Sequence, residues 1–64
     1  MRFWIECTGF ETGQPIHINI ALVGSMSRDG ERTVLTYVGE GQTIEVTETP
    51  ERILDMHFGP SAKA

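Results

Sequence analysis

The 64-residue chain is predicted to be a mainly β (α+β) domain. It should form a small curled antiparallel sheet, or partly open barrel, of about five strands with one short C-terminal helix. β-branched residues are plentiful, with six Ile, four Val and seven Thr, whereas only three residues are Leu. Apolar and polar residues alternate in several short runs, and glycine-rich turn signals separate these runs. Together, these observations favour strands.

The length allows a single small domain, which we expect to span residues 1–59, with residues 60–64 as a flexible tail. One cysteine cannot form an internal disulfide. No apolar run approaches the roughly 20 residues that cross a membrane, and the first residues lack the apolar region of a secretory signal. We therefore expect a cytoplasmic protein that does not associate with membranes.

The first two strands follow from strict alternation. In residues 2–8, Phe3, Ile5 and Cys7 fall on one side, opposite a side that includes Trp4. Residues 16–20 alternate again and place three isoleucines on one face. Pro15 suits the start or edge of this second strand because proline has no backbone N–H to donate.

The middle of the chain predicts an antiparallel meander. In residues 21–27 both faces are mildly apolar, and Gly24 suggests a bulge or close packing. The stretch around residues 19–22 also fits a short helical turn. Asp29-Gly30 predicts a tight hairpin turn before the β-prone run 33–38. A second glycine turn at 39–41 leads into an alternating run at 43–47.

A helix is predicted after the last strand. Thr49 suits the N-cap, Pro50 the first helical position, and Glu51 the positive end of the helix dipole. Gly59-Pro60 should stop the helix. Strand phase and helix spacing together predict one core, formed by Phe3, Ile5, Ile16, Ile18, Leu35, Ile44, Val46 and Ile53.

Residues that could support catalysis or metal binding are few. Cys7 lies on the apolar face and is interpreted as a small buried hydrophobe. His17 and His57 have no metal-site spacing with it, and His17 is expected opposite Glu6 on a polar face. The acidic residues of the strand end and helix start fit a solvated surface. We expect no enzyme activity, no cofactor and no metal.

The charge balance argues against nucleic acid as a partner. Nine Asp or Glu residues outnumber five Lys or Arg, giving a formal net charge of −4. The arginines are dispersed rather than gathered in a basic stripe, so strong phosphate binding is not expected.

Protein binding is the remaining function class with candidate residues. Trp4 falls on the face opposite the core side of the first strand. This tryptophan could be covered by a curled sheet or by the helix, or it could anchor an interface. The residues predicted to contact a protein partner are Trp4, Glu6, Glu45 and Glu48.

The order of short motifs resembles a known family, the small flagellar FlbD-type proteins, also called swarming-motility proteins. The similarity extends over roughly residues 3–56 and rests on Ile5-Glu6-Cys7-Thr8, Gly13, Pro15-Ile16-His17-Ile18-Asn19, Leu22-Val23, Thr33-Val34-Leu35-Thr36, Gly41, Val46-Thr47-Glu48 and Glu51-Arg52-Ile53. The resemblance implies no catalysis and no cofactor.

We therefore expect a non-enzymatic protein-interaction module, acting as a regulator, an adaptor or a phage-type inhibitor. The alternative is a small dimeric regulatory nucleic-acid-binding protein. A single core below about 70–80 residues often needs a disulfide, a metal or a partner chain for stability. Since the first two are not expected, the sequence predicts a homodimer, with Trp4 at or near the interface.

Overall fold

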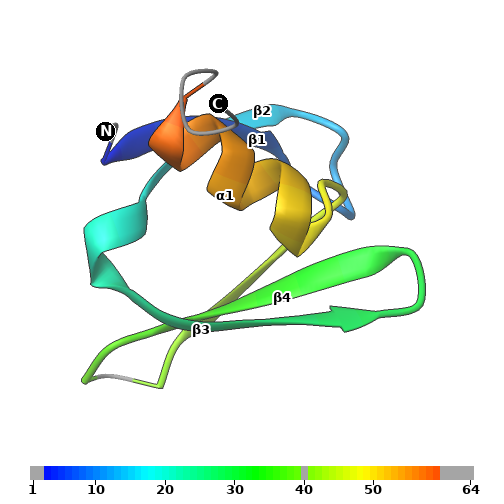
Figure 1. Cartoon of the computed structure of the whole chain (residues 1–64). Coiled ribbons are helices and arrows are strands. Elements are labelled where there is room, and N and C mark those ends of the chain that lie inside the picture. The colour runs from blue at the N-terminus through cyan, green and yellow to red at the C-terminus, as the bar shows by residue number, and fades with distance from the viewer. Residues whose placement is uncertain (1–2, 40, 60–64) are drawn as a thin grey trace.

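The computed structural model describes residues 3–39 and 41–59 and confirms a mainly β fold with one short C-terminal helix (Figure 1). The predicted tail at 60–64 lies outside the described residues. The elements in chain order are β1 (Trp4–Thr8), β2 (Pro15–Asn19), the 3-10 helix η1 (Ile20–Leu22), β3 (Val23–Asp29), β4 (Arg32–Tyr37), β5 (Thr43–Val46) and α1 (Pro50–Phe58).

The strands form two antiparallel sheets rather than one continuous curled sheet. The first is the β1–β2 hairpin, and the second has the order β3-β4-β5. The two sheets meet at one corner, through an isolated bridge between Gly9 and Val46. Beside the bridge, the Phe10 N–H donates to the Glu45 carbonyl at 3.0 Å, and the Thr47 N–H donates to the Thr8 carbonyl at 3.0 Å. The result is an open arrangement, not a closed barrel.

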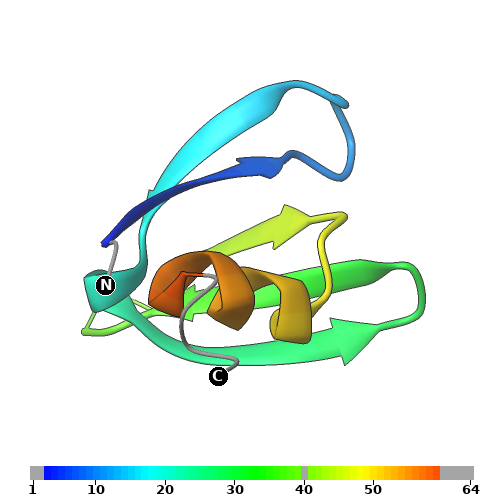
Figure 2. The same ribbon diagram turned by 45° about the horizontal axis from the view of Figure 1, so that its top comes forward.

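Helix α1 fills the space that the two sheets leave between them. It packs against β1 and β3, and Figures 1 and 2 show it between the hairpin and the three-stranded sheet. The Thr49 side chain accepts a hydrogen bond from the Arg52 N–H, and Pro50 opens the helix, as predicted. The helix ends at Phe58 and is capped by Gly59, whose φ of 85° is readily accessible only to glycine and whose N–H donates to the Asp55 carbonyl.

Both local features expected around Gly24 occur. Asn19 caps η1 by accepting a hydrogen bond from the Ala21 N–H, so the short helical turn is confirmed. The β3–β4 register then shifts between Val23 and Ser25, which is the irregularity expected at Gly24. A Cβ at Gly24 would lie 3.2 Å from a Val38 methyl group, so the backbone of β3 approaches this side chain closely.

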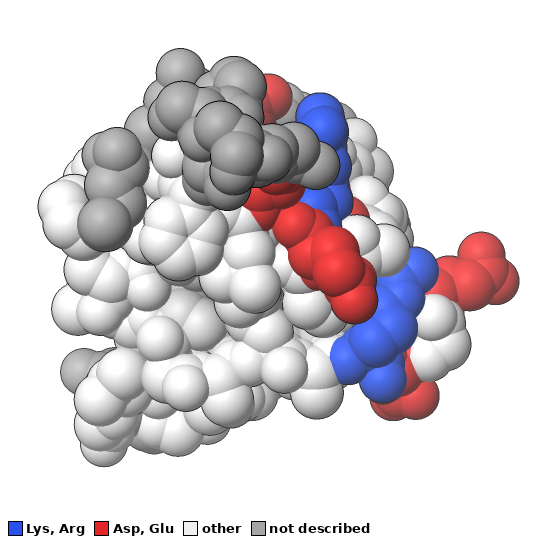
Figure 3. Space-filling view, viewed as in Figure 1, with Lys and Arg blue, Asp and Glu red and all other residues white. Residues whose placement is uncertain are grey.

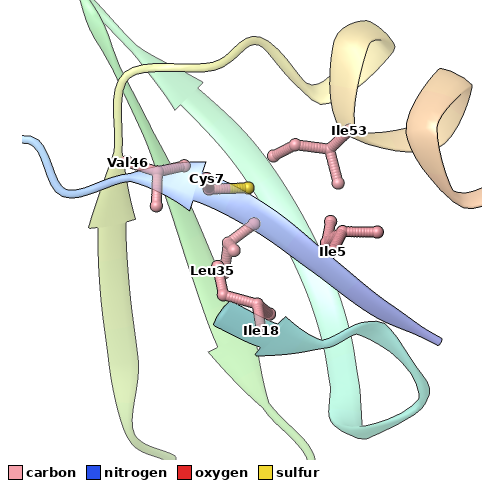
Figure 4. Packing of buried hydrophobic residues seen from close by; sticks show 6 residues of the cluster. All are labelled: Ile5, Cys7, Ile18, Leu35, Val46 and Ile53. Carbon is pink, nitrogen blue, oxygen red and sulfur yellow. The ribbon is translucent and has the colours of Figure 1, made fainter. Parts of the chain in front are cut away.

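The core lies at the centre of the three layers. It consists of side chains from both sheets and the helix, shown in Figure 4: Ile5, Cys7, Ile18, Leu35, Val46 and Ile53. Five predicted core residues are therefore buried, and Cys7 is buried as interpreted. Ile16 and Ile44 are half-buried and pack against this cluster.

Phe3 was predicted to be in the core, and this is wrong. Its side chain is 53% exposed, although its position fits the core side of β1 by alternation. Strand β1 begins only at Trp4, so Phe3 lies beyond the end of the ladder that holds the core residues in place. The alternation correctly predicted the side of the strand on which Phe3 lies, but it did not predict where along the strand the core ends.

Candidate protein-interaction surface

Six large apolar side chains are exposed on four segments: the start of β1, η1, the residue that follows β4, and α1. We call this set the apolar rim, and it consists of Phe3, Trp4, Leu22, Val38, Leu54 and Phe58. The remaining exposed large apolar side chain among the described residues is Phe10, which follows the other end of β1. In Figures 1 and 2 the start of β1, η1 and the end of α1 lie at the same end of the fold.

The ring of His57 connects two members of the apolar rim, Phe3 and Phe58. The ring of His57 lies 6.0 Å from that of Phe3 and 4.8 Å from that of Phe58, measured between centroids. Leu54 precedes Phe58 by four residues, so both occupy one face of α1. These contacts link the start of β1 to the end of the helix.

Backbone hydrogen bonds connect the start of β1 to η1, and η1 to the residue that follows β4. The Ile20 N–H donates to the Phe3 carbonyl at 2.6 Å, which fixes the start of β1 beside η1. At the end of η1, the Leu22 carbonyl accepts from the Val38 N–H at 2.8 Å. The rim is therefore built from four separate parts of the chain that only the fold brings together.

The segments that carry the second half of the rim are free of charged residues. No Lys, Arg, Asp or Glu occurs in residues 18–27 or 33–39. On the face shown in Figure 3, the charged side chains gather at one side, and the opposite side shows neither basic nor acidic residues. On this face the described Lys, Arg, Asp and Glu residues thus occupy one side, which we call the charged end.

Trp4 and Glu6 lie on the outer face of the hairpin, as predicted. Trp4 is exposed, so neither the sheet nor the helix covers its indole. It lines an open hollow of about 310 Å³, together with Glu6, His17 and Met56. Glu6 is the register partner of His17, and the carboxylate lies 3.7 Å from the imidazole Nε2. Both side chains are well exposed, so this pair leaves Trp4 accessible.

Glu45 lies at the charged end, away from the apolar rim. Its carboxylate lies 3.2 Å from the guanidinium of Arg32, which also contacts Asp29 at 3.1 Å. The hydrogen bond to Asp29 and the charge of Glu45 raise the pKa of Arg32, so this arginine stays ionised. Arg32 also lies 5.9 Å from the centroid of the Phe10 ring.

Glu48 joins the two sheets instead of projecting into solvent. Its carboxylate accepts a hydrogen bond from the Thr8 N–H at 2.8 Å and another from the Thr8 hydroxyl at 2.9 Å. The Glu48 carbonyl accepts from the hydroxyl of Thr33, a fully buried polar residue of β4. Glu48 therefore holds the β5–α1 connection against the end of β1, and we do not include it in the binding surface.

The arginines of β3 and β4 form hydrogen bonds and ion pairs within the molecule. Arg28 donates through Nη1 to the Thr33 hydroxyl and to the Thr47 carbonyl, and through Nε to the Gly30 carbonyl. Arg32 is paired with two carboxylates, as described above. Phosphate groups would have to compete with these partners, so the described arginines do not favour nucleic-acid binding.

Cys7 has the environment of an unreactive thiol. It is 1% exposed, and burial, with a smaller contribution from the charge of Glu48, raises its pKa to about 11. Residues 3–39 and 41–59 contain no group of three or more His, Cys, Asp or Glu side chains that could hold a metal ion.

Most of the apolar rim was missed by the sequence reasoning. Trp4 was identified, but Leu22, Val38, Leu54 and Phe58 were not. One available signal was the mild apolar character of both faces of residues 21–27, combined with the absence of charge there and in residues 33–39. In a half-buried strand, one of the two faces is normally polar.

Comparisons with protein-family models, with curated proteins and with solved structures found no match. Within the part of the chain that the structure describes, no helix has the length and apolar composition needed to cross a membrane.

Proposed function

We propose that this chain is a small non-enzymatic protein-interaction module that binds a partner protein through its apolar rim. The observation that carries the proposal is the exposure of six large apolar side chains, most of them on elements that meet where β1 begins and α1 ends. Contiguous exposed apolar surface is costly in water, and where it persists it commonly marks a binding surface. A regulator, an adaptor and a phage-type inhibitor would all use such a surface.

The composition of the rim supports this proposal. Aromatic residues are enriched in the centres of protein interfaces, and the rim offers Phe3, Trp4 and Phe58. Trp4 and Phe58 belong to β1 and α1, and the Phe3 backbone is hydrogen-bonded to Ile20, so fixing these rings on binding would cost little conformational entropy. The charged end, with its internally paired arginines, would remain in solvent.

The chain itself offers a matched pair of variants to test the proposal. Phe58→Ser removes an exposed ring from the rim, whereas Phe10→Ser removes an exposed ring from the charged end. Tagged wild-type protein and both variants would be used to capture proteins from extracts of the organism that encodes the chain. Captured proteins would be quantified by mass spectrometry, and each variant's fold would be checked by circular dichroism.

We expect one or more proteins to be retained by the wild type and by Phe10→Ser, but lost from Phe58→Ser. An identical set of captured proteins for all three baits would overturn the rim as the binding surface. Retention of the wild type on heparin at neutral pH, abolished by Arg28→Ala, would instead favour the nucleic-acid-binding alternative. A flagellar role, which the FlbD-type resemblance implies, would be supported by capture of flagellar components.

A further inference from the structure

We infer that the apolar rim binds a second copy of this chain, giving a two-fold symmetric homodimer. The inference rests on the proposed function and names the partner for its surface. In such a dimer the same surface would serve both subunits, so each rim residue of one copy would meet rim residues of the other. Trp4 would then lie within or beside the interface.

Electrostatics favours this face over the others as a contact between identical copies. Each chain has a formal net charge of −4, so two copies repel one another overall. Residues 18–27 and 33–39 carry no charged side chain, and they hold Leu22 and Val38 of the rim. Two copies can approach through these two segments without bringing charged side chains of the segments together, and Glu6, beside Trp4, would then lie at the border of the interface.

The size of the rim is consistent with a small dimer interface. Phe3 is 53% exposed, Trp4 64% and Phe58 47%. Because each aromatic side chain can bury about 150–250 Å², these three rings offer roughly 330 Å². The three aliphatic members bring the apolar rim to roughly 600 Å², so two copies would bury at most roughly 1,200 Å², the lower end of specific interfaces.

The alternative route to a dimer, pairing of sheet edges, is less favourable through β2 and β3. Hydrogen bonds from Gly9 to Gln14 and from Ile20 to Phe3 fix which residues of β2 face β1. By alternation, Pro15 faces the open edge of β2, and proline cannot donate to an added strand. The open edge of β3 is interrupted by the irregularity at Gly24. Contact through side chains of the rim avoids both obstacles.

The test measures mass and tryptophan emission over the same concentration series. Light scattering and analytical ultracentrifugation would follow the mass from about 1 to 500 µM, a range that brackets the dissociation constant expected of a small interface. Trp4 is the only tryptophan, so its fluorescence reports on the rim alone. We expect the mass to change from one chain to two, and the Trp4 emission to shift to shorter wavelength over the same range.

Variants then locate the contact. Val38→Ser and Phe58→Ser should each raise the dissociation constant roughly tenfold or more, as loss of a central interface side chain does. Phe10→Ser should leave it within about twofold, because its side chain lies outside the rim. If the wild type dimerises and none of the rim substitutions changes its dissociation constant, the inference is overturned.

The outcomes separate this inference from the proposed function. A wild-type mass of one chain, with constant Trp4 emission up to 500 µM, would overturn the homodimer. The capture experiment could still succeed in that case, because the rim would then bind a different protein. This wild-type measurement needs no variant, so it remains decisive even if a substitution impairs folding.

Discussion

At the scale of single residues, the role of a side chain depends on what the fold places opposite it. Glu6, Glu45 and Glu48 are all acidic residues of strands or strand ends, and the sequence predicted one role for all three. Glu6 is exposed beside His17, and Glu45 pairs with Arg32. Glu48 instead accepts two hydrogen bonds from Thr8, forty positions away in the chain. Only the first is free to act at a surface near Trp4.

Cys7 should react slowly with thiol reagents in the folded protein. The thiolate is the reactive form, and a pKa of about 11 leaves far less of it at pH 8 than the ordinary pKa does. We expect alkylation of the folded protein to be roughly a hundredfold slower, or more, than in urea. Mass spectrometry of iodoacetamide-treated samples would measure both rates. Equal rates would show that Cys7 is exposed.

The same pKa predicts a pH dependence of stability. The folded-state pKa is raised, so Cys7 contributes stability below the ordinary thiol pKa, and that contribution decreases as the pH rises towards about 11. Comparing the free energy of unfolding of wild type and Cys7→Ala over this range isolates the thiol from other titrating groups.

At the scale of elements, helix caps and turn residues determine where each helix and strand begins and ends. Asn19 caps η1, Gly30 has the φ of 65° that the β3–β4 turn requires, and Thr49 caps α1. Each of these signals acts within a few residues of its own position. This is why the order of the elements, including the helix start, could be predicted from the sequence.

Thr49→Ala should lower the free energy of unfolding by about 1 kcal/mol, because the Arg52 N–H loses its acceptor at the start of α1. Thr49→Asp is the matched control, since aspartate can accept the same hydrogen bond and is expected to retain most of the stability. Urea unfolding followed by circular dichroism would compare the three proteins. Equal stability of Thr49→Ala and wild type would show that the cap contributes nothing.

At the scale of the whole molecule, six side chains from two sheets and one helix supply the buried core. A core this small leaves little tolerance for an added charge, because small domains are stable by only about 5–15 kcal/mol. The two sheets contact each other at one corner, and the helix completes the enclosure. The fold is therefore expected to unfold as one unit.

Ile18→Asp should abolish the cooperative thermal transition, because it places an unpaired carboxylate at a fully buried position. Ala21→Asp is the control: it adds the same charge three residues later, at an exposed position of η1. Calorimetry of both variants would show whether each one keeps its cooperative thermal transition. A retained transition in Ile18→Asp would contradict the strand phase on which the core rests.

The sequence by itself determined the fold class, the strand phase, the turns and the helix cap. These depend on alternation, on glycine conformation and on side chains that bond to nearby backbone, all of which are local. It also predicted five buried core residues correctly, and it failed at Phe3, where the ladder had not yet begun.

The tertiary structure alone decided the pairing of Glu48 with Thr8, the burial of Thr33 and the assembly of the apolar rim. Leu22 meets Val38 through a backbone hydrogen bond, and Phe3 meets His57 across the gap between the hairpin and the helix. These partners are 16 and 54 positions apart in the chain. No local pattern encodes such distances, because they are set by how the two sheets close around the helix.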